Sequence, residues 1–404
     1  MTNEYGIIAG IDVHKMWLYI AVGNKEGNEY QRHRCGTRTV ELAALADWLN
    51  EHQVTTVVME STAQYWKPVW LALEGRFGLL LAQAESNAAR PGRKMDYWDA
   101  ERLVRRLHAR DLVLSFVPDA EQRQWRMLTR NRVEYGRQIG QVRNHVETLL
   151  EECRIKISGY LSDLFGTSGM RILNALASGE RNVEKLAALR SGPIKATRQE
   201  MEEALNGEMS GMQQLVLRQM LEQVAQLNKH VEELSVCITG QLEQYADAVR
   251  RLCEIPGVGV VAAQQIIAEL GSEAATFPTS DQVSSWVGVS PGKRETAGKS
   301  KSNKSPQGNR QMRRILTQCA WAGIRTKGTA LSERFHRMVP RMGAGKAIWA
   351  AAHRLLEVIW IVLHRHESYK EFGATRSPLA AAKRLAKLTR EIQKLGYQVS
   401  AVPV

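Results

Sequence analysis

Four acidic residues stand where a divalent-metal site could form. Asp12 lies at the end of a β-rich run, in GIDVHK, and Glu60 ends a second run, TTVVME. Asp96 and Asp99 are three residues apart in RKMDYWDAERL, so they would share one face of a helix start. Taken singly, each suits an ordinary turn, strand end or helix cap. Together, carboxylates without histidine or cysteine predict a Mg²⁺ or Mn²⁺ site that could polarise a phosphodiester.

The first hundred residues alternate strand and helix signals that would position these acids. In order, the signals are strands at 6–11, 17–22 and 29–34, a helix at 40–49, a strand at 54–59, a helix at 65–75, a strand at 79–82 and the helix start at 96–99. This is the order of a ribonuclease H-like α/β domain, although other α/β folds share the alternation. If the strands that carry Asp12 and Glu60 are neighbours, their carboxylates converge at one edge of the sheet.

The strand signals stop near residue 118, and long helical patterns follow. One polar helix pattern covers 121–152, and a later one carries an apolar seam with alternating spacings of three and four. The seam comprises Leu217, Met220, Val224, Leu227, Val231, Leu234 and Ile238. Such a seam suits a coiled coil, a two-helix hairpin or an amphipathic helix packed on its own domain.

The chain is long enough, at 404 residues, for three regions of different fold class. We expect an α/β domain at 1–118, a helical and coiled-coil region at 119–246 with an insertion near 155–215, and a mainly helical domain at 247–404. No run reaches the roughly 18 uninterrupted apolar residues of a membrane span, and the start of the chain does not resemble a signal peptide. Five cysteines stand far apart without a C-x-x-C pair. These features predict a cytoplasmic protein whose thiols are reduced and which does not associate with a membrane.

The net charge of +13 predicts a polyanionic partner, because clustered Lys and Arg displace counterions from phosphates. Ten Lys and Arg stand between Gly288 and Lys327 against one acid, Glu295. Ahead of this cluster, Gly257 and Gly259 in IPGVG resemble a helix-hairpin-helix turn that binds a DNA phosphate, or they only permit a tight turn. The predicted nucleic-acid-binding residues are Lys293, Arg294, Lys299, Lys301, Lys304, Arg310, Arg313, Gly257 and Gly259.

Several ordered motifs closely resemble the insertion-sequence 110 family of transposases. The motifs are GIDVHK, VVMEST, RKMDYWDAERL, IPGVG, SSWVGVSPGKRETAGKSKSNKSPQGNRQMRRIL and AWAGIRTKGT, and the resemblance covers roughly 1–150 and 245–375. It implies a RuvC-like domain whose Asp-Glu-Asp-Asp cluster maps onto Asp12, Glu60, Asp96 and Asp99, a coiled coil and a C-terminal transposase domain.

The resemblance also implies partners and assembly. Family members are guided by a structured noncoding bridge RNA that pairs with donor and target DNA. They act as tetramers, a dimer of dimers, in which one protomer's RuvC-like domain shares an active site with another's C-terminal domain. The resemblance therefore implies an RNA-guided DNA recombinase in the bacterial cytoplasm, associated with the nucleoid when active.

The family's nucleophilic serine is replaced in this chain. The family has Glu-Ser-Gly or Glu-Ser-Ala, whereas this chain has Glu295-Thr296-Ala297-Gly298. Thr296 keeps a hydroxyl, but its β-branch restricts χ1 and crowds an in-line attack.

Three interpretations of this departure are open: Thr296 is the nucleophile, Ser300 or Ser302 replaces it, or the protein is slow or inactive. Two other functions also remain, a Holliday-junction nuclease that uses water and a decayed nucleic-acid-binding protein. The retained hydroxyl and the intact set of four carboxylates favour the recombinase.

Overall fold

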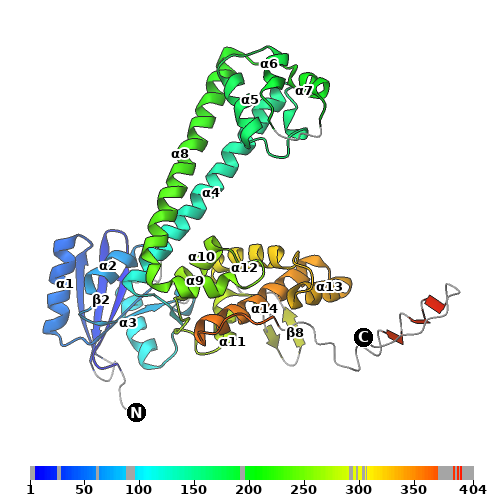
Figure 1. Ribbon diagram of the computed structural model, residues 1–404. Helices are drawn as coiled ribbons and strands as arrows, with labels where there is room; N and C mark the ends of the chain where they lie inside the picture. The colour runs from blue at the N-terminus through cyan, green and yellow to red at the C-terminus, as the bar shows by residue number, and fades with distance from the viewer. Residues whose placement is uncertain are drawn as a thin grey trace. The chain divides into compact units, whose positions relative to one another are not determined.

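The computed structural model describes residues 5–371, apart from gaps at 25–28, 61–62, 88–95, 192–195, 291–293, 297–298, 303–304 and 306, together with six positions between 385 and 393. The chain divides into two compact units, Met1–Asp119 and Ala120–Val404. Unit 1 contains a mixed sheet with helices and unit 2 is mostly helical (Figure 1), which confirms the predicted combination of α/β and helical parts. The predicted boundary at residue 247 stays a prediction.

Unit 1 is built on a six-stranded sheet with the order β3-β2-β1-β4-β5-β6. The strands are β1 (Ile8–Val13), β2 (Trp17–Gly23), β3 (Tyr30–Gly36), β4 (Thr56–Glu60), β5 (Gly78–Ala82) and β6 (Leu114–Ser115). Strands β1, β2 and β3 pair antiparallel, whereas β1, β4 and β5 pair parallel. The five predicted strands are confirmed; the sequence does not predict β6, because two residues carry no period.

Helices cover both faces of this sheet. On one face, α1 (Thr39–Glu51) and α2 (Trp66–Leu73) pack against a core that includes Ile11 and Met59. On the other face, α3 (Asp96–His108) packs against Ile8 and Val58. Because side chains alternate along a strand, neighbours of Ile11 and Met59 face α3. The short helix η1 (Ala84–Asn87) follows β5.

Unit 2 begins with two long helices, α4 (Ala120–Glu152) and α8 (Gly211–Gln241), which lie side by side in opposite directions (Figure 1). Val224 and Leu227 of the predicted seam are buried with Ile139 and Val142 of α4. The seam therefore forms the two-helix hairpin, one of the arrangements that the sequence left open. Self-association through this region stays a prediction.

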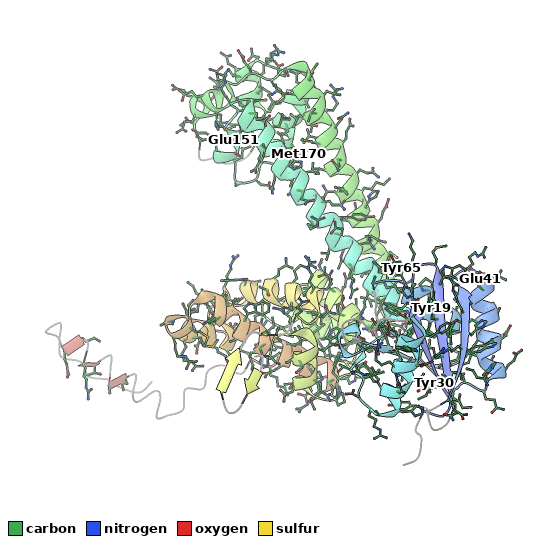
Figure 2. All side chains as sticks on the ribbon, turned by 180° about the vertical axis from the view of Figure 1, so that it is seen from behind. Tyr19, Tyr30, Glu41, Tyr65, Glu151 and Met170 are labelled. Atoms are coloured by element: carbon green, nitrogen blue, oxygen red, sulfur yellow. The ribbon has the colours of Figure 1, made fainter. Side chains whose placement is uncertain are left out.

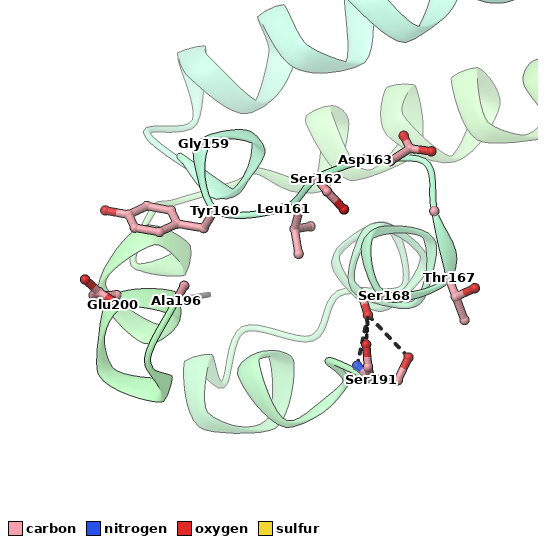
Figure 3. Close-up of a pocket in the computed structure, with 11 residues that line it drawn as sticks. Gly159, Tyr160, Leu161, Ser162, Asp163, Thr167, Ser168, Ser191, Ala196 and Glu200 are labelled. Atoms are coloured by element: carbon pink, nitrogen blue, oxygen red, sulfur yellow. Dashed lines mark hydrogen bonds between the residues drawn. The ribbon is translucent and has the colours of Figure 1, made fainter. Parts of the chain in front are cut away.

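The segment between α4 and α8 has its own core. It contains η2 (Ile157–Gly159), α5 (Thr167–Ala177), α6 (Val183–Ala188) and α7 (Arg198–Leu205), packed with the ends of α4 and α8. A cavity of about 700 Å³ is lined by η2, α5, α7 and the loops beside them, and in it the Ser168 hydroxyl donates to the Ser191 carbonyl at 2.9 Å (Figure 3). No predicted site residue lines this cavity.

The rest of unit 2 is a helical assembly with one hairpin. Its elements are η3 (Glu243–Tyr245), α9 (Ala246–Cys253), α10 (Val260–Leu270), α11 (Ser280–Val287), β7 (Arg294–Thr296), β8 (Lys299–Ser302), α12 (Arg310–Gly323), α13 (Ala330–Met342) and α14 (Ala344–His364). Among the helices described, α14 alone has the length and hydropathy to cross a membrane, but 56% of its apolar window is buried within the protein. Leu355, Leu356 and Ile359 are buried, as in a core helix.

Candidate metal centre and nucleic-acid interface

The sheet brings Asp12 and Glu60 to the same edge. Parallel pairing places Ile11 of β1 opposite Met59 of β4, so the following residues, Asp12 and Glu60, are neighbours across the two strands. Ile11 and Met59 face the α1 and α2 core, and alternation directs Asp12 and Glu60 towards the α3 face. The predicted convergence of these two carboxylates is therefore present in the fold.

Gly10 allows α3 to approach the same point. A Cβ at Gly10 would lie 2.2 Å from the carbonyl oxygen of Ala100, so only glycine leaves room for the helix backbone. Asp96 and Asp99 occupy the first turn of α3, where the positive end of the helix dipole stabilises carboxylates. Asp99 is 6% exposed and immediately precedes Ala100. The contact at Gly10 thus holds both acids beside β1.

His14 connects two of the acids, and the sequence did not single it out. Its Nε2 lies 3.1 Å from Oδ2 of Asp12 and 3.6 Å from Oδ1 of Asp96. Donor atoms of these three residues all lie within 4.8 Å of one another, as a shared metal would require. The imidazole also contacts the ring of Tyr19 edge-on, at 5.7 Å between centroids; Tyr19 is labelled in Figure 2. The available signal was the spacing of two residues between Asp12 and His14, which continues one face of a strand.

A second set of contacts fixes Glu60 and Asp99. The Asn87 amide donates to Oε2 of Glu60 at 2.8 Å, and Asn87 is 1% exposed. Arg102 donates to the Asn87 carbonyl at 2.9 Å and to Oδ1 of Asp99 at 2.6 Å. Nothing in the sequence pattern indicated Asn87, whereas Arg102 lies one helical turn after Asp99. Asn87 and Arg102 therefore orient the carboxylates of Glu60 and Asp99.

The electrostatics of the cluster favour a bound cation. Burial raises the pKa of the Asp12 carboxyl above its usual value, and the nearby charges of Asp99 and Glu60 act in the same direction. His14 opposes them through its charge and its hydrogen bond. A buried carboxylate among other carboxylates is costly to ionise unless positive charge compensates it. The carboxylate oxygens of the cluster fit Mg²⁺ or Mn²⁺, whereas the imidazole of His14, which the predicted donor set without histidine lacked, is a ligand more typical of Zn²⁺ or Fe²⁺. The cluster therefore fits a divalent metal ion.

Thr296 ends β7 at the tip of a two-stranded hairpin. Antiparallel pairing places Thr296 opposite Lys299 and Glu295 opposite Ser300. The structure describes the backbone of β7 and β8 but not the side chains of Thr296, Arg294, Lys299 and Lys301. Two predicted nucleic-acid-binding residues, Lys293 and Lys304, lie outside the described residues.

The two arginines of α12 that were predicted to bind nucleic acid have different surroundings. Arg310 is exposed in the first turn of the helix. Arg313 lies over the ring of Trp349 at 4.7 Å and donates to the Gln307 carbonyl at 2.8 Å. Arg310 is therefore the more accessible of the two to a phosphate.

The two predicted glycines also differ. Gly257 has φ +88, and a Cβ there would lie 2.3 Å from the Cys319 carbonyl oxygen of α12. Gly259 is the N-cap of α10, and a Cβ there would meet no atom within 4 Å. Gly257 therefore serves the tight turn and the packing of α12, which leaves Gly259 and the start of α10 open to a ligand. Phosphate binding at this turn stays a prediction.

Comparison with known proteins identifies the family of this arrangement. A DEDD transposase model of the IS110 family matches residues 9–155, the region with all four acids. A model described as Transposase IS116/IS110/IS902 family matches residues 249–336, the region with Gly257 and Thr296. The chain belongs to the IS110 family of transposases.

Two relatives agree with this membership. The chain is 25% identical over 157 residues to the "Insertion element IS900 uncharacterized 42 kDa protein" of Mycobacterium paratuberculosis, which covers 38% of this chain and 39% of that protein. It is 30% identical over 125 residues to the "Transposase for insertion sequence element IS1111A" of Coxiella burnetii, which covers 30% of this chain and 34% of that protein. The similarity of this IS110-family chain to both relatives thus spans less than half of their length.

Proposed function

We propose that this IS110-family protein is a DNA recombinase that cleaves and exchanges donor and target strands. The observation that carries the proposal is that three separate segments bring four acids to the α3 face of one sheet, where donor atoms of Asp12, Asp96 and His14 lie within 4.8 Å of one another. The strand order and the DEDD model support a ribonuclease H-like, RuvC-like fold for unit 1. In this proposal Asp12, Glu60, Asp96 and Asp99 bind Mg²⁺, which Mn²⁺ could replace.

The chain's own residues would prepare the metal centre. Asn87 and Arg102 hold the carboxylates of Glu60 and Asp99, and Gly10 keeps α3 against β1. A bound pair of Mg²⁺ ions supplies electrostatic stabilisation to the attacking and leaving oxygens of a phosphodiester. His14 lies within hydrogen-bond reach of Asp12 and would orient that carboxylate.

In the proposed reaction, the Thr296 hydroxyl is the nucleophile. Its oxygen attacks the phosphorus and loses its proton, one phosphodiester P–O bond breaks, and the departing sugar oxygen takes up a proton. The number of phosphate ester bonds is unchanged, so strand exchange needs no ATP. Ser300 and Ser302 are the alternative nucleophiles on β8.

We further propose that a structured guide RNA selects the donor and target DNA by base pairing. The basic segment with Arg294, Lys299 and Lys301 would bind the nucleic-acid backbone. The assembly would be a tetramer, a dimer of dimers, that acts on DNA in the bacterial cytoplasm. The support is family membership and the net charge of +13. Sequencing the RNA that copurifies with the protein tests the guide. We expect one discrete noncoding RNA, and a heterogeneous mixture of cellular RNA without such a species would contradict the proposal.

Strand cleavage in Mg²⁺ tests the metal centre. We expect Asp12→Asn and Glu60→Gln to abolish cleavage and joining of labelled donor DNA, because each removes a metal ligand but keeps the shape of its side chain. Asp47→Asn is the control, because Asp47 is an exposed carboxylate on α1 that binds Arg76. Equal activity of Asp12→Asn and the Asp47→Asn control would refute the assignment.

A further inference from the structure

A cleft in unit 2 is lined by arginines from two helices that are distant in sequence. It has a volume of about 920 Å³, and its lining residues come from α4, α8, α10 and α12. The ribbons of these four helices can be followed in Figure 1. Its charged lining residues are Arg132, Glu134, Arg137, Arg310 and Arg314. Four cations therefore face one carboxylate across the same space.

Arg132 is a buried cation whose acceptors among the described residues are neutral. It is 5% exposed, and its guanidinium donates to Oε1 of Gln264 at 2.7 Å and to the Val261 carbonyl at 3.2 Å. Its Nε is buried and has no hydrogen-bond partner within the described part of the chain. Burial lowers the pKa of Arg132, which reflects the cost of this charge. Such a charge becomes favourable when an anion compensates it.

Arg314 repeats this pattern on the α12 side. Its one hydrogen bond to a described residue is to Oε1 of Gln265 at 3.5 Å, and its buried Nε has no partner among the residues described. Burial lowers the pKa of Arg314 as well. The carboxylate in the cleft, Glu134, is occupied by Arg137, which donates to both of its oxygens. Among the residues that the structure describes, no carboxylate therefore compensates Arg132 and Arg314 in the cleft, and exposed Arg310 lies at its rim.

The cleft also opens beside a segment that is itself basic. Helix α12 begins at Arg310, directly after the stretch from 288 to 309 that carries five Lys and Arg against one acid. Guanidinium groups bind phosphate oxygens through paired, charge-assisted hydrogen bonds. We propose that this cleft binds the phosphodiester backbone of a nucleic acid, with Arg132 and Arg314 at its floor and Arg310 at its rim. The choice of nucleic acid over another anion rests on the proposed function.

The test is the salt dependence of binding, measured in EDTA so that the result does not depend on strand cleavage. The cleft variant is Arg310→Gln/Arg314→Gln, and the control is Arg218→Gln/Arg334→Gln, which removes the same charge from exposed arginines of α8 and α13. The probes are a fluorescent DNA duplex of mixed sequence and a single-stranded RNA of the same sequence. The cleft variant should lower the log–log salt slope by about 1.8 on duplex DNA or about 1.4 on single-stranded RNA. The control should leave both slopes unchanged.

A second pair of variants adds charge instead of removing a side chain, so loss of folding cannot explain the result. Gln318→Glu places a carboxylate on the α12 wall of the cleft, and Gln219→Glu does the same on exposed α8. Weaker binding by Gln318→Glu together with unchanged binding by Gln219→Glu supports the proposal. The probe whose binding weakens identifies DNA or RNA as the ligand. Unchanged binding and slope in both cleft variants overturn it. A change of oligomeric state without a change in binding also overturns it, because an acidic surface of a second copy would then occupy the cleft.

Discussion

Replacing Gly10 by alanine should separate the two halves of the proposed metal centre without changing a carboxylate. The added Cβ would lie 2.2 Å from the Ala100 carbonyl oxygen and 3.0 Å from Cγ2 of Val104. Real Cβ atoms essentially never approach below 3.0 Å, so the α3 backbone must retreat by about 0.8 Å. Asp99 precedes Ala100 on the same helical turn and must move with it.

Two magnitudes follow from this displacement. Forcing an extra methyl into a packed contact destabilises a protein by about 1–3 kcal/mol. A functional site tolerates displacements of only about 0.5 Å, so a shift of about 0.8 Å should also weaken metal binding. In the wild type, Mg²⁺ at 100 times its Kd should add about 2.7 kcal/mol to the unfolding free energy of unit 1. We expect most of that increment to disappear in Gly10→Ala.

Hydrogen exchange of β1 and α3 peptides, with and without Mg²⁺, measures both effects in the full chain. Gly140→Ala is the matched control, because a Cβ at Gly140 in α4 meets no atom within 4 Å. That control should gain about 0.5–1 kcal/mol in α4 peptides from helix propensity, and its β1 and α3 peptides should keep the full response to Mg²⁺. Wild-type stability and a wild-type Mg²⁺ response in Gly10→Ala would show that the contact at Gly10 does not position α3 for metal binding.

Three further predictions concern other parts of the chain. Thr296→Val should form no covalent protein–DNA adduct while Thr296→Ser retains it, as a gel shift under denaturing conditions would record; an adduct in Thr296→Val would move the nucleophile elsewhere. Glu269→Gln should lower the unfolding free energy by about 2 kcal/mol in urea titrations, because it breaks a buried ion pair. The loss is smaller than for a fully buried pair, since one of the two arginine partners is 42% exposed, and an unchanged unfolding free energy would contradict the prediction. At pH 8 a maleimide should label exposed Cys237 in the native protein and leave buried Cys319 unlabelled. Burial raises the pKa of the Cys319 thiol to about 11, and the reactive thiolate forms only as the pH approaches that value. Equal labelling of the two cysteines, measured by mass spectrometry, would contradict this prediction.

The sequence predicted the elements of unit 1 well because each has a local signature. Strand β1 and strand β4 are apolar runs of the right length, and the helices carry apolar residues at helical spacing. The prediction ended β1 at Ile11, whereas the strand continues to Val13, because pairing with β2 continues through Asp12 and Val13. The hairpin of α4 and α8 was one of three arrangements compatible with the seam.

Residues of the proposed metal centre were predictable where a strand end or a helix start identifies them. Asp12 and Glu60 follow from parallel strands, since the carboxyl ends of such strands meet at one edge. Asn87 lies in a four-residue helix with no period, so no pattern connected it with Glu60. The arginine cleft depends on Arg132 and Arg314, which are 182 positions apart and meet only through the packing of α4, α10 and α12. Contacts at this separation leave no local signal.

The most direct measurement identifies the residue that becomes attached to DNA. Wild-type protein is incubated with donor DNA and Mg²⁺, denatured and digested, and the nucleotide-bearing peptide is sequenced by mass spectrometry. We predict a phosphate ester on Thr296 in the wild type and no adduct in Asp12→Asn, because the proposed reaction of the hydroxyl requires the intact metal centre. Cleaved strands without any adduct, as a nuclease that uses water would give, would contradict it.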